Sequence, residues 1–144
     1  FRVPSLMRSA SVEIEIPFHD VDLVGIAWHG HYAKYFELAR CALLDSFDYG
    51  YDKMFESGYA WPVIDMHIRY AQACEFGQKI RVTATLEEWE YRLKIRYRVE
   101  DAASGRRLTK GHTVQVAVRI EDKEMCLASP DILRQKLGLA PSKA

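Results

Sequence analysis

The chain has 144 residues, 49% of them hydrophobic and 28% charged, which suits one compact domain and is too short for two ordinary ones. Lysine plus arginine and aspartate plus glutamate both total 20, so net charge gives no general attraction to nucleic acid or to an anionic membrane. The three cysteines, Cys41, Cys74 and Cys126, form no C-x-x-C pair. Their spacing disfavours a disulfide framework or a structural zinc site and fits a reducing cytoplasm.

The first residues give little structural signal. The sequence has no run of about 18 apolar residues, and its opening segment lacks the apolar stretch of a secretory signal, so we expect neither a membrane span nor export. We treat residues 1–11 as an N-terminal extension, with Met7 as a candidate native initiator, and residues 12–144 as a single domain.

The first predicted element is a half-buried strand over residues 12–18. Its apolar residues fall at every second position: Val12, Ile14, Ile16 and Phe18. A polar loop follows over residues 19–30. Apolar residues then recur at helical spacing over residues 30–49, which predicts the main helix, with Gly50 as its C-terminal stop. A short helical turn is expected after Asp52 and should end at Gly58.

Four more strands are predicted in series, over residues 64–70, 80–87, 92–99 and 108–120, each with one apolar face. The inward residues of the first run are Ile64, Met66, Ile68 and Tyr70. A last helix should begin with Ser129 as N-cap and Pro130 in first position, and end at Gly138. A sheet with one apolar face and a single long apolar helix favours a two-layer α+β fold in which the sheet wraps around that helix.

The densest group of reactive side chains lies over residues 19–31, immediately before the main helix. It contains Asp20, Asp22, His19, His29 and His31. Loops at the ends of rigid elements often carry function. The unpaired N–H groups and positive dipole end of a helix N-terminus would stabilise a developing oxyanion. We therefore expect a carboxylate, a histidine and an oxyanion site to converge here.

The segment FHDVDLVGIAWHGHYAKYFELAR resembles the signature of the 4-hydroxybenzoyl-CoA thioesterase family, including its YbgC-like acyl-CoA thioesterases. The family pattern is D-x-D-x-x-G-x-V-x-[HY]-x-x-Y, followed by E-x-x-R on the helix. The matching positions are Asp20, Asp22, Gly25, His29, Tyr32, Glu37 and Arg40, with Ala27 at the usual valine position. The order of elements extends the resemblance from about Val12 to Ile120.

The resemblance implies a hot-dog fold: a five-stranded antiparallel sheet wrapped around one long central helix, plus a short C-terminal helix. It also implies hydrolysis of an acyl-CoA or acyl carrier protein thioester, and a tetramer as the usual assembly. An open edge strand of such a sheet can pair with its twin, so we expect at least a homodimer, or a homotetramer. No metal or cofactor is implied, because CoA is part of the substrate.

The family's functional residues can be carried over by motif position. Asp22 becomes the catalytic carboxylate, as nucleophile or general base, and the backbone N–H of His29 becomes the donor to the thioester carbonyl, with the His29 side chain assisting. The expected supporting residues are Gly25, Gly30, Glu37 and Arg40, and the expected substrate-pocket residues are Trp28, Tyr32 and Phe18. Phe18 stands where the YbgC-like branch has a tyrosine, so one hydroxyl is missing.

Simpler interpretations compete with these roles. Asp20 and Asp22 can each cap a turn, and for Asp20 we expect a structural role that holds the loop. The loop's histidines and carboxylates also resemble a metal-ligand set. Glu37 and Arg40 are three residues apart, the spacing of a weak surface ion pair. Glu37 is nevertheless the main rival to Asp22 as the catalytic carboxylate.

A basic strand face has two interpretations. Four cations point the same way, namely Arg92, Lys94, Arg96 and Arg98. With Arg69 and Arg81 they would either contact CoA phosphates or another polyanion, or form a solvated face balanced by Glu87 and Glu90. His67 and His112 are expected at the core edge or an interface.

Two alternative functions remain open from the sequence. One is an acyl-thioester dehydratase or hydratase that uses His29 and Glu37. The other is a non-catalytic acyl-CoA-binding subunit.

Overall fold

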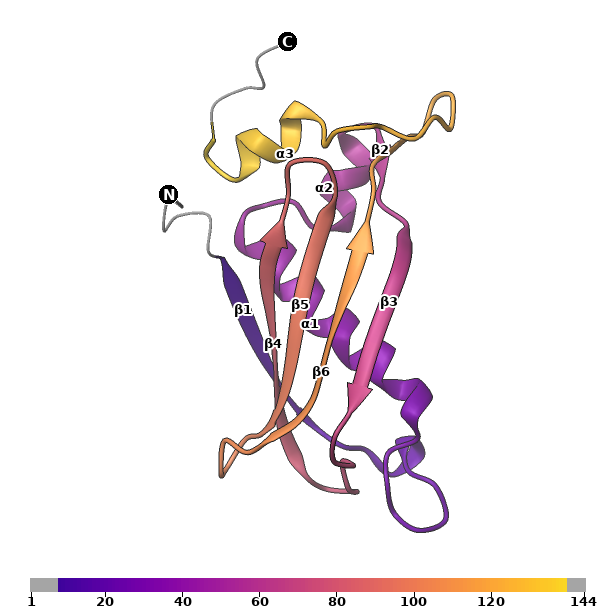
Figure 1. Ribbon diagram of the computed structural model, residues 1–144, viewed down its shortest axis with the longest axis vertical. Helices are drawn as coiled ribbons and strands as arrows, with labels where there is room; N and C mark the ends of the chain where they lie inside the picture. The colour runs from indigo at the N-terminus through magenta and orange to yellow at the C-terminus, as the bar shows by residue number, and fades with distance from the viewer. Residues whose placement is uncertain (1–7, 140–144) are drawn as a thin grey trace.

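The structure, a computed structural model, describes residues 8–139 and has two layers, a five-stranded antiparallel sheet and a long helix (Figure 1). From edge to edge the sheet contains β1 (Ser9–Glu15), β4 (Lys79–Glu88), β5 (Leu93–Asp101), β6 (Arg107–Gln115) and β3 (Val63–Tyr70). A second, two-stranded sheet pairs β2 (Tyr59–Ala60) with β7 (Val118–Arg119). The helices are α1 (Tyr32–Ser46), α2 (Tyr51–Glu56) and α3 (Asp131–Lys136), with 3-10 turns η2 (Phe18–Asp20) and η3 (His29–His31).

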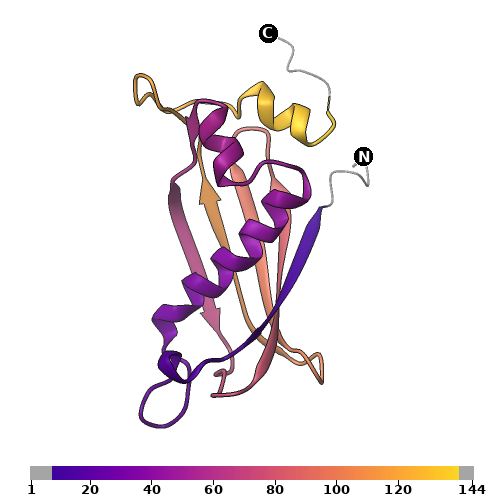
Figure 2. The same cartoon turned by 180° about the vertical axis from the view of Figure 1, so that it is seen from behind.

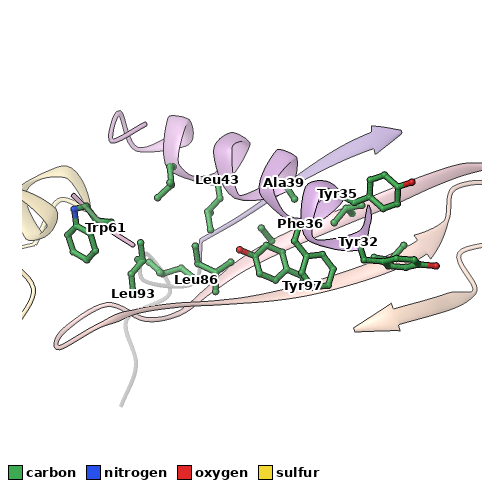
Figure 3. Close-up of a cluster of buried hydrophobic side chains, with 14 of the residues drawn as sticks. Tyr32, Tyr35, Phe36, Ala39, Leu43, Trp61, Leu86, Leu93 and Tyr97 are labelled. Atoms are coloured by element: carbon green, nitrogen blue, oxygen red, sulfur yellow. The ribbon is translucent and has the colours of Figure 1, made fainter. Parts of the chain in front are cut away.

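The helix α1 crosses one face of the sheet diagonally (Figure 2), and we call this face of the sheet the inner face. The buried side chains of α1 recur every three or four residues and include Tyr32, Tyr35, Phe36, Ala39 and Leu43. The Phe36 ring stacks on that of Tyr97 from β5 at a centroid distance of 4.4 Å (Figure 3). Full burial of one such large apolar side chain contributes about 1.5–3 kcal/mol to folding. The predicted wrapping of one sheet around one long helix is confirmed.

The edge strand β3 departs from the prediction of a half-buried strand. All its residues are exposed except Ile68, which is half-buried. Two predicted inward residues, Ile64 and Met66, are 59% and 38% exposed. The reason is the position of α1, which packs on β1, β4 and β5 and leaves the β3 side of the inner face uncovered.

Predicted boundaries before and after α1 also change. β1 begins at Ser9, three residues earlier than expected, and ends at Glu15, so Phe18 lies in a 3-10 turn and not in the strand. The rest of the predicted extension, residues 1–7, lies outside the described residues. The helix α1 ends at Ser46 and the chain reverses through Asp48 at a φ of 59°, while Gly50 is the N-cap of α2 and not a stop.

Some of the boundaries predicted for the C-terminal third of the chain also change. The strand predicted over residues 108–120 is divided, because β6 ends at Gln115 and the chain then pairs with β2 as β7. Pro130 is the N-cap of α3, and the Ser129 hydroxyl is buried without a hydrogen-bond partner, so Ser129 does not cap the helix. The predicted helix end at Gly138 is confirmed by its φ of 77°. No helix within residues 8–139 is long and apolar enough to cross a membrane.

Candidate active site

The loop before α1 is a narrow hairpin rather than an open loop. The Trp28 N–H donates to the Asp20 carbonyl at 2.9 Å, and the Asp22 N–H donates to the Ile26 carbonyl at 2.9 Å. Gly25 closes the tip, where its N–H donates to the Asp22 carbonyl and its φ of 79° requires the left-handed region that favours glycine. These bonds fix the backbone of residues 20–28 relative to α1.

The Asp20 carboxylate anchors this hairpin to the first turn of α1. It is buried, and it accepts hydrogen bonds from Lys34 Nζ on both oxygens at 2.7 Å and from the Tyr35 hydroxyl at 2.8 Å. Burial alone would raise the pKa of Asp20, but the bonds from Lys34 and Tyr35 hold that pKa below its ordinary value. The predicted structural role of Asp20 is confirmed.

The Asp22 carboxylate is exposed and has one anchored and one free oxygen. Its Oδ1 accepts the backbone N–H groups of Val24 at 3.0 Å and Ile26 at 3.3 Å, which is the turn-capping role considered above. Within the described residues its Oδ2 has no hydrogen-bond partner. The side chain is therefore held in place while one oxygen remains available to a ligand.

Asp22 opens onto a cavity of about 300 Å³. The lining residues are Asp22, Ile26, Ala27, Trp28, His29, Tyr32, Tyr70, Ala71, Gln72 and Ala73. Asp22, Trp28, His29 and Tyr32 thus line one cavity. Phe18 does not line the cavity, because it is 76% exposed and its ring packs edge-on against Phe76 at 5.7 Å.

Two backbone donors lie beside this cavity at the start of the helical segment. In the described part of the chain, neither the His29 N–H nor the Gly30 N–H has a hydrogen-bond acceptor, as is usual for the first residues of a helix. The Trp28 ring lies so close to Gly30 that a Cβ there would overlap it. The pair of free N–H groups forms a candidate oxyanion site.

Tyr70, the last residue of β3, is a site residue that the sequence did not single out. Its hydroxyl donates to the His29 carbonyl at 2.8 Å, and its ring packs against those of His29 and Tyr32. The His29 carbonyl and the Gly30 N–H belong to the same peptide group, so this bond orients one of the two candidate oxyanion donors. The only sequence signal was the inward register of Tyr70 at a strand end.

Glu37 and Arg40 are not part of the cavity lining. Arg40 is buried, and it donates to the hydroxyls of Tyr51 at 2.8 Å and Tyr97 at 3.3 Å. The expected surface ion pair with the exposed Glu37 does not form, because the Arg40 guanidinium turns into the core. Arg40 therefore contacts tyrosines between α1, α2 and β5 rather than the loop.

The loop's histidines do not converge on a metal site. Within residues 8–139 no group of three or more His, Cys, Asp and Glu side chains has the geometry to hold a metal ion. His19 and His31 lie 3.6 Å and 3.8 Å from Asp20, whose oxygens are already bonded to the Lys34 ammonium.

Comparison with known proteins adds to this geometry. Residues 16–136 match the family profile described as the thioesterase-like superfamily. A protein of Bacillus subtilis (strain 168) named "Putative acyl-CoA thioesterase YneP" is 29% identical over 83 residues, which are 58% of this chain and 60% of that protein. The alignment thus spans only 60% of that relative's length.

Solved structures resemble the whole fold. Hypothetical protein TT1821 from Thermus thermophilus has a TM-score of 0.79 at 26% identity, with 90% of this chain and 97% of that chain covered. A DHNA-CoA thioesterase from Staphylococcus aureus has a TM-score of 0.76 at 24% identity, with 83% and 80% covered. The similarity to the Staphylococcus aureus protein shows a shared fold and nothing more.

Proposed function

Because this chain belongs to the thioesterase-like superfamily and has its hot-dog fold, we propose that it hydrolyses acyl-CoA thioesters with Asp22 as the catalytic carboxylate. The observation that supports this most is that Asp22 and His29 line one cavity, beside the two free N–H groups of His29 and Gly30. The name of the Bacillus subtilis relative agrees with this activity.

The proposed reaction uses these groups in a simple order. The thioester carbonyl oxygen accepts hydrogen bonds from the His29 and Gly30 N–H groups, which stabilise the negative charge of the tetrahedral intermediate. Asp22 Oδ2 either attacks the carbonyl carbon or removes a proton from an attacking water. Collapse of the intermediate expels the CoA thiolate, and in the first route water then hydrolyses the mixed anhydride. The products are a carboxylic acid and CoA.

We further propose membership of the YbgC-like branch of the 4-hydroxybenzoyl-CoA thioesterases. His29 keeps the histidine of that branch and lines the cavity, and its ring packs near those of Trp28 and Tyr70, at centroid distances of 5.0 Å and 6.1 Å. Because His29 and Asp22 line the same cavity, we propose that the His29 ring assists a proton transfer there. The dehydratase or hydratase alternative has less support, since Glu37 does not line the cavity with His29.

Assembly through β3 is part of the same proposal. β3 is a sheet edge of eight residues with exposed apolar side chains at Ile64 and Met66. A strand edge of this kind readily pairs with another strand. Pairing of two copies through β3 would make a continuous sheet and cover the inner-face residues that α1 leaves open.

The Asp22→Asn variant tests the proposed function directly. Asparagine keeps an oxygen that can accept the Val24 and Ile26 N–H groups, so the loop should keep its shape, while the charge is removed. Turnover is measured as thiol release from a panel of aliphatic and aryl CoA esters. We expect it to fall about 10²–10⁴-fold in the variant, with the melting temperature nearly unchanged.

Two results would contradict the proposal. Unchanged thiol release in Asp22→Asn would remove Asp22 from catalysis. A parent protein that binds CoA but releases no thiol from any ester of the panel would instead be a non-catalytic binding subunit.

A further inference from the structure

The outer face of the sheet, which points away from α1, carries an ordered block of basic side chains. Cross-strand partners point to the same face of a sheet. The register aligns Arg98 of β5 with Lys110 of β6 and then Arg69 of β3. A second row lies two residues away along each strand, where Arg96 of β5 is aligned with His112 of β6 and His67 of β3. We call these six residues the outer basic block.

This block breaks a general rule of sheet stability. Like charges directly opposite each other on neighbouring strands are destabilising. Arg98, Lys110 and Arg69 nevertheless form one continuous row across three strands. A local conflict of this kind is expected at functional sites, where a ligand supplies the missing opposite charge.

Carboxylates balance only part of this face. Near β4 and β5, Arg92 pairs with Glu88 at 3.0 Å and Arg81 pairs with Glu13 at 3.4 Å, as a solvated face would. Arg96 and Arg98 have partners in Glu87 and Glu100, and His112 lies 3.7 Å from Asp65 of β3.

The side nearest β3 is different. In the part of the chain that the structure describes, Arg69, Arg107 and Lys110 have no carboxylate partner. Arg107 begins β6 beside the block, and Arg69 and Lys110 are exposed. Unbalanced positive charge therefore concentrates over β6 and β3, although the whole chain has a net charge of zero.

The outer face is hollowed over β4, β5 and β6, next to β3, and is rich in donors there. A depression of about 250 Å³ is lined by Thr83, Thr85, Arg96, Arg98, Arg107 and Lys110, with part of Tyr97. Neighbouring positions in such a block are about 5 Å apart across strands and about 7 Å apart along them. That grid offers several cations at once to a ligand that carries several phosphate groups, and arginine suits phosphate geometry well.

The block and the catalytic cavity meet at one end of the sheet. Tyr70 lines the cavity on the inner face, and the residue before it, Arg69, belongs to the outer block. Both lie at the arrowhead of β3, at the same end of the molecule as the hairpin of residues 20–28 (Figure 1). The segment after β3, residues 71–73, lines the cavity and is exposed, so a ligand can leave the cavity around the end of β3.

We propose that the outer basic block binds the 3′-phosphorylated adenosine diphosphate part of the CoA substrate while the thioester occupies the Asp22 cavity. This rests on the proposed thioesterase function and names the phosphate-binding residues of the same substrate. Within the block Arg69 and Lys110 contribute most, because they are its arginine and lysine residues that no carboxylate neutralises. The block gives CoA esters an advantage over thioesters that lack the nucleotide.

The test compares two double variants with equal loss of charge. Arg69→Ala/Lys110→Ala removes two of the three unbalanced cations, whereas Arg81→Ala/Arg92→Ala removes two cations of the same face that are paired with glutamates. Each protein is assayed with one acyl group presented as its CoA ester and as its pantetheine ester. Binding of 3′,5′-ADP and of CoA is measured by calorimetry, and melting temperatures check folding.

We expect Arg69→Ala/Lys110→Ala to raise KM for the CoA ester about tenfold, the effect of two exposed ionic contacts, and to leave kcat nearly unchanged. KM for the pantetheine ester should not change, nor should either value in the control variant. Weaker binding of 3′,5′-ADP should accompany the change.

Three results would overturn the inference. The first is the same KM for the CoA ester in both double variants, and the second is an equal rise in KM for the CoA ester and the pantetheine ester. The third is that Arg69→Ala/Lys110→Ala binds a DNA duplex more weakly than the parent while its CoA binding is unchanged. If the parent hydrolyses neither ester, the proposed function fails, and calorimetry with CoA still decides whether the block binds the nucleotide.

Discussion

The Tyr70→Phe substitution tests whether β3 positions the candidate oxyanion site. Phenylalanine keeps the ring that lines the cavity and packs on His29 and Tyr32, and removes only the hydroxyl that donates to the His29 carbonyl at 2.8 Å. That carbonyl still accepts the Tyr32 N–H, so the substitution leaves no buried group unpaired.

The size of the effect follows from this single bond. A neutral hydrogen bond contributes about 1 kcal/mol net. Hydrogen bonds in a chain polarise one another, so the Tyr70 hydroxyl also strengthens the Gly30 N–H as a donor. Loss of about 1 kcal/mol from the transition state predicts about a fivefold lower kcat. KM should change little, because the cavity wall keeps its shape.

The assay measures kcat and KM for thiol release by the parent, Tyr70→Phe, Tyr70→Leu and Tyr91→Phe. Tyr91 is 64% exposed and outside the cavity lining, so its hydroxyl loss is a matched control without expected effect. Tyr70→Leu removes the ring as well and should also raise KM. A kcat of Tyr70→Phe equal to that of the parent, or a change in KM alone, would refute the positioning role.

Two further predictions concern stability and assembly. Asp20→Asn should lower the free energy of unfolding at pH 7 by about 2 kcal/mol, because it weakens charge-assisted bonds to Lys34 and Tyr35. The folded-state pKa of Asp20 is depressed below the ordinary 3.8, so its contribution is present above about pH 4 and is lost as pH falls through the lower folded value. Urea titrations should therefore show the gap between parent and variant closing below pH 4, and a gap independent of pH would contradict the assignment. Ile64→Lys on the exposed β3 should reduce the mass measured by light scattering towards that of a monomer, while Phe55→Lys on α2, also exposed, should not. Equal masses for parent and Ile64→Lys would argue against assembly through β3.

The fold could be predicted from the sequence because burial on one face leaves a period in the chain. The alternation of Ile80, Val82, Ala84 and Leu86 marks the inner face of β4, and all four are buried. The same alternation in β3 gave a wrong burial prediction. An apolar face indicates that something covers it, but the pattern does not say whether the cover is α1 or another chain.

The candidate site was predictable where the residues adjoin the main helix in sequence. Asp22, Trp28, His29 and Tyr32 lie within eleven residues of each other, so one loop and one helix start bring them together. Tyr70 and residues 71–73 come from the end of β3, 41 residues after His29 in the case of Tyr70. Their place at the cavity depends on the register of β3 against β6, which local sequence patterns do not report.

The two neighbouring aspartates show how the structure separates residues that the sequence presents alike. Asp20 and Asp22 belong to one motif, but only Asp20 faces the first turn of α1, where Lys34 and Tyr35 occupy both of its oxygens. A carboxylate bonded in this way is a poor nucleophile or base, because it would first have to lose the ammonium partner. Asp22 is held by backbone N–H groups on Oδ1 alone, and its Oδ2 faces no competing donor within the described residues. The sequence difference that separates them therefore lies 14 residues later, at Lys34, and not in the aspartates themselves.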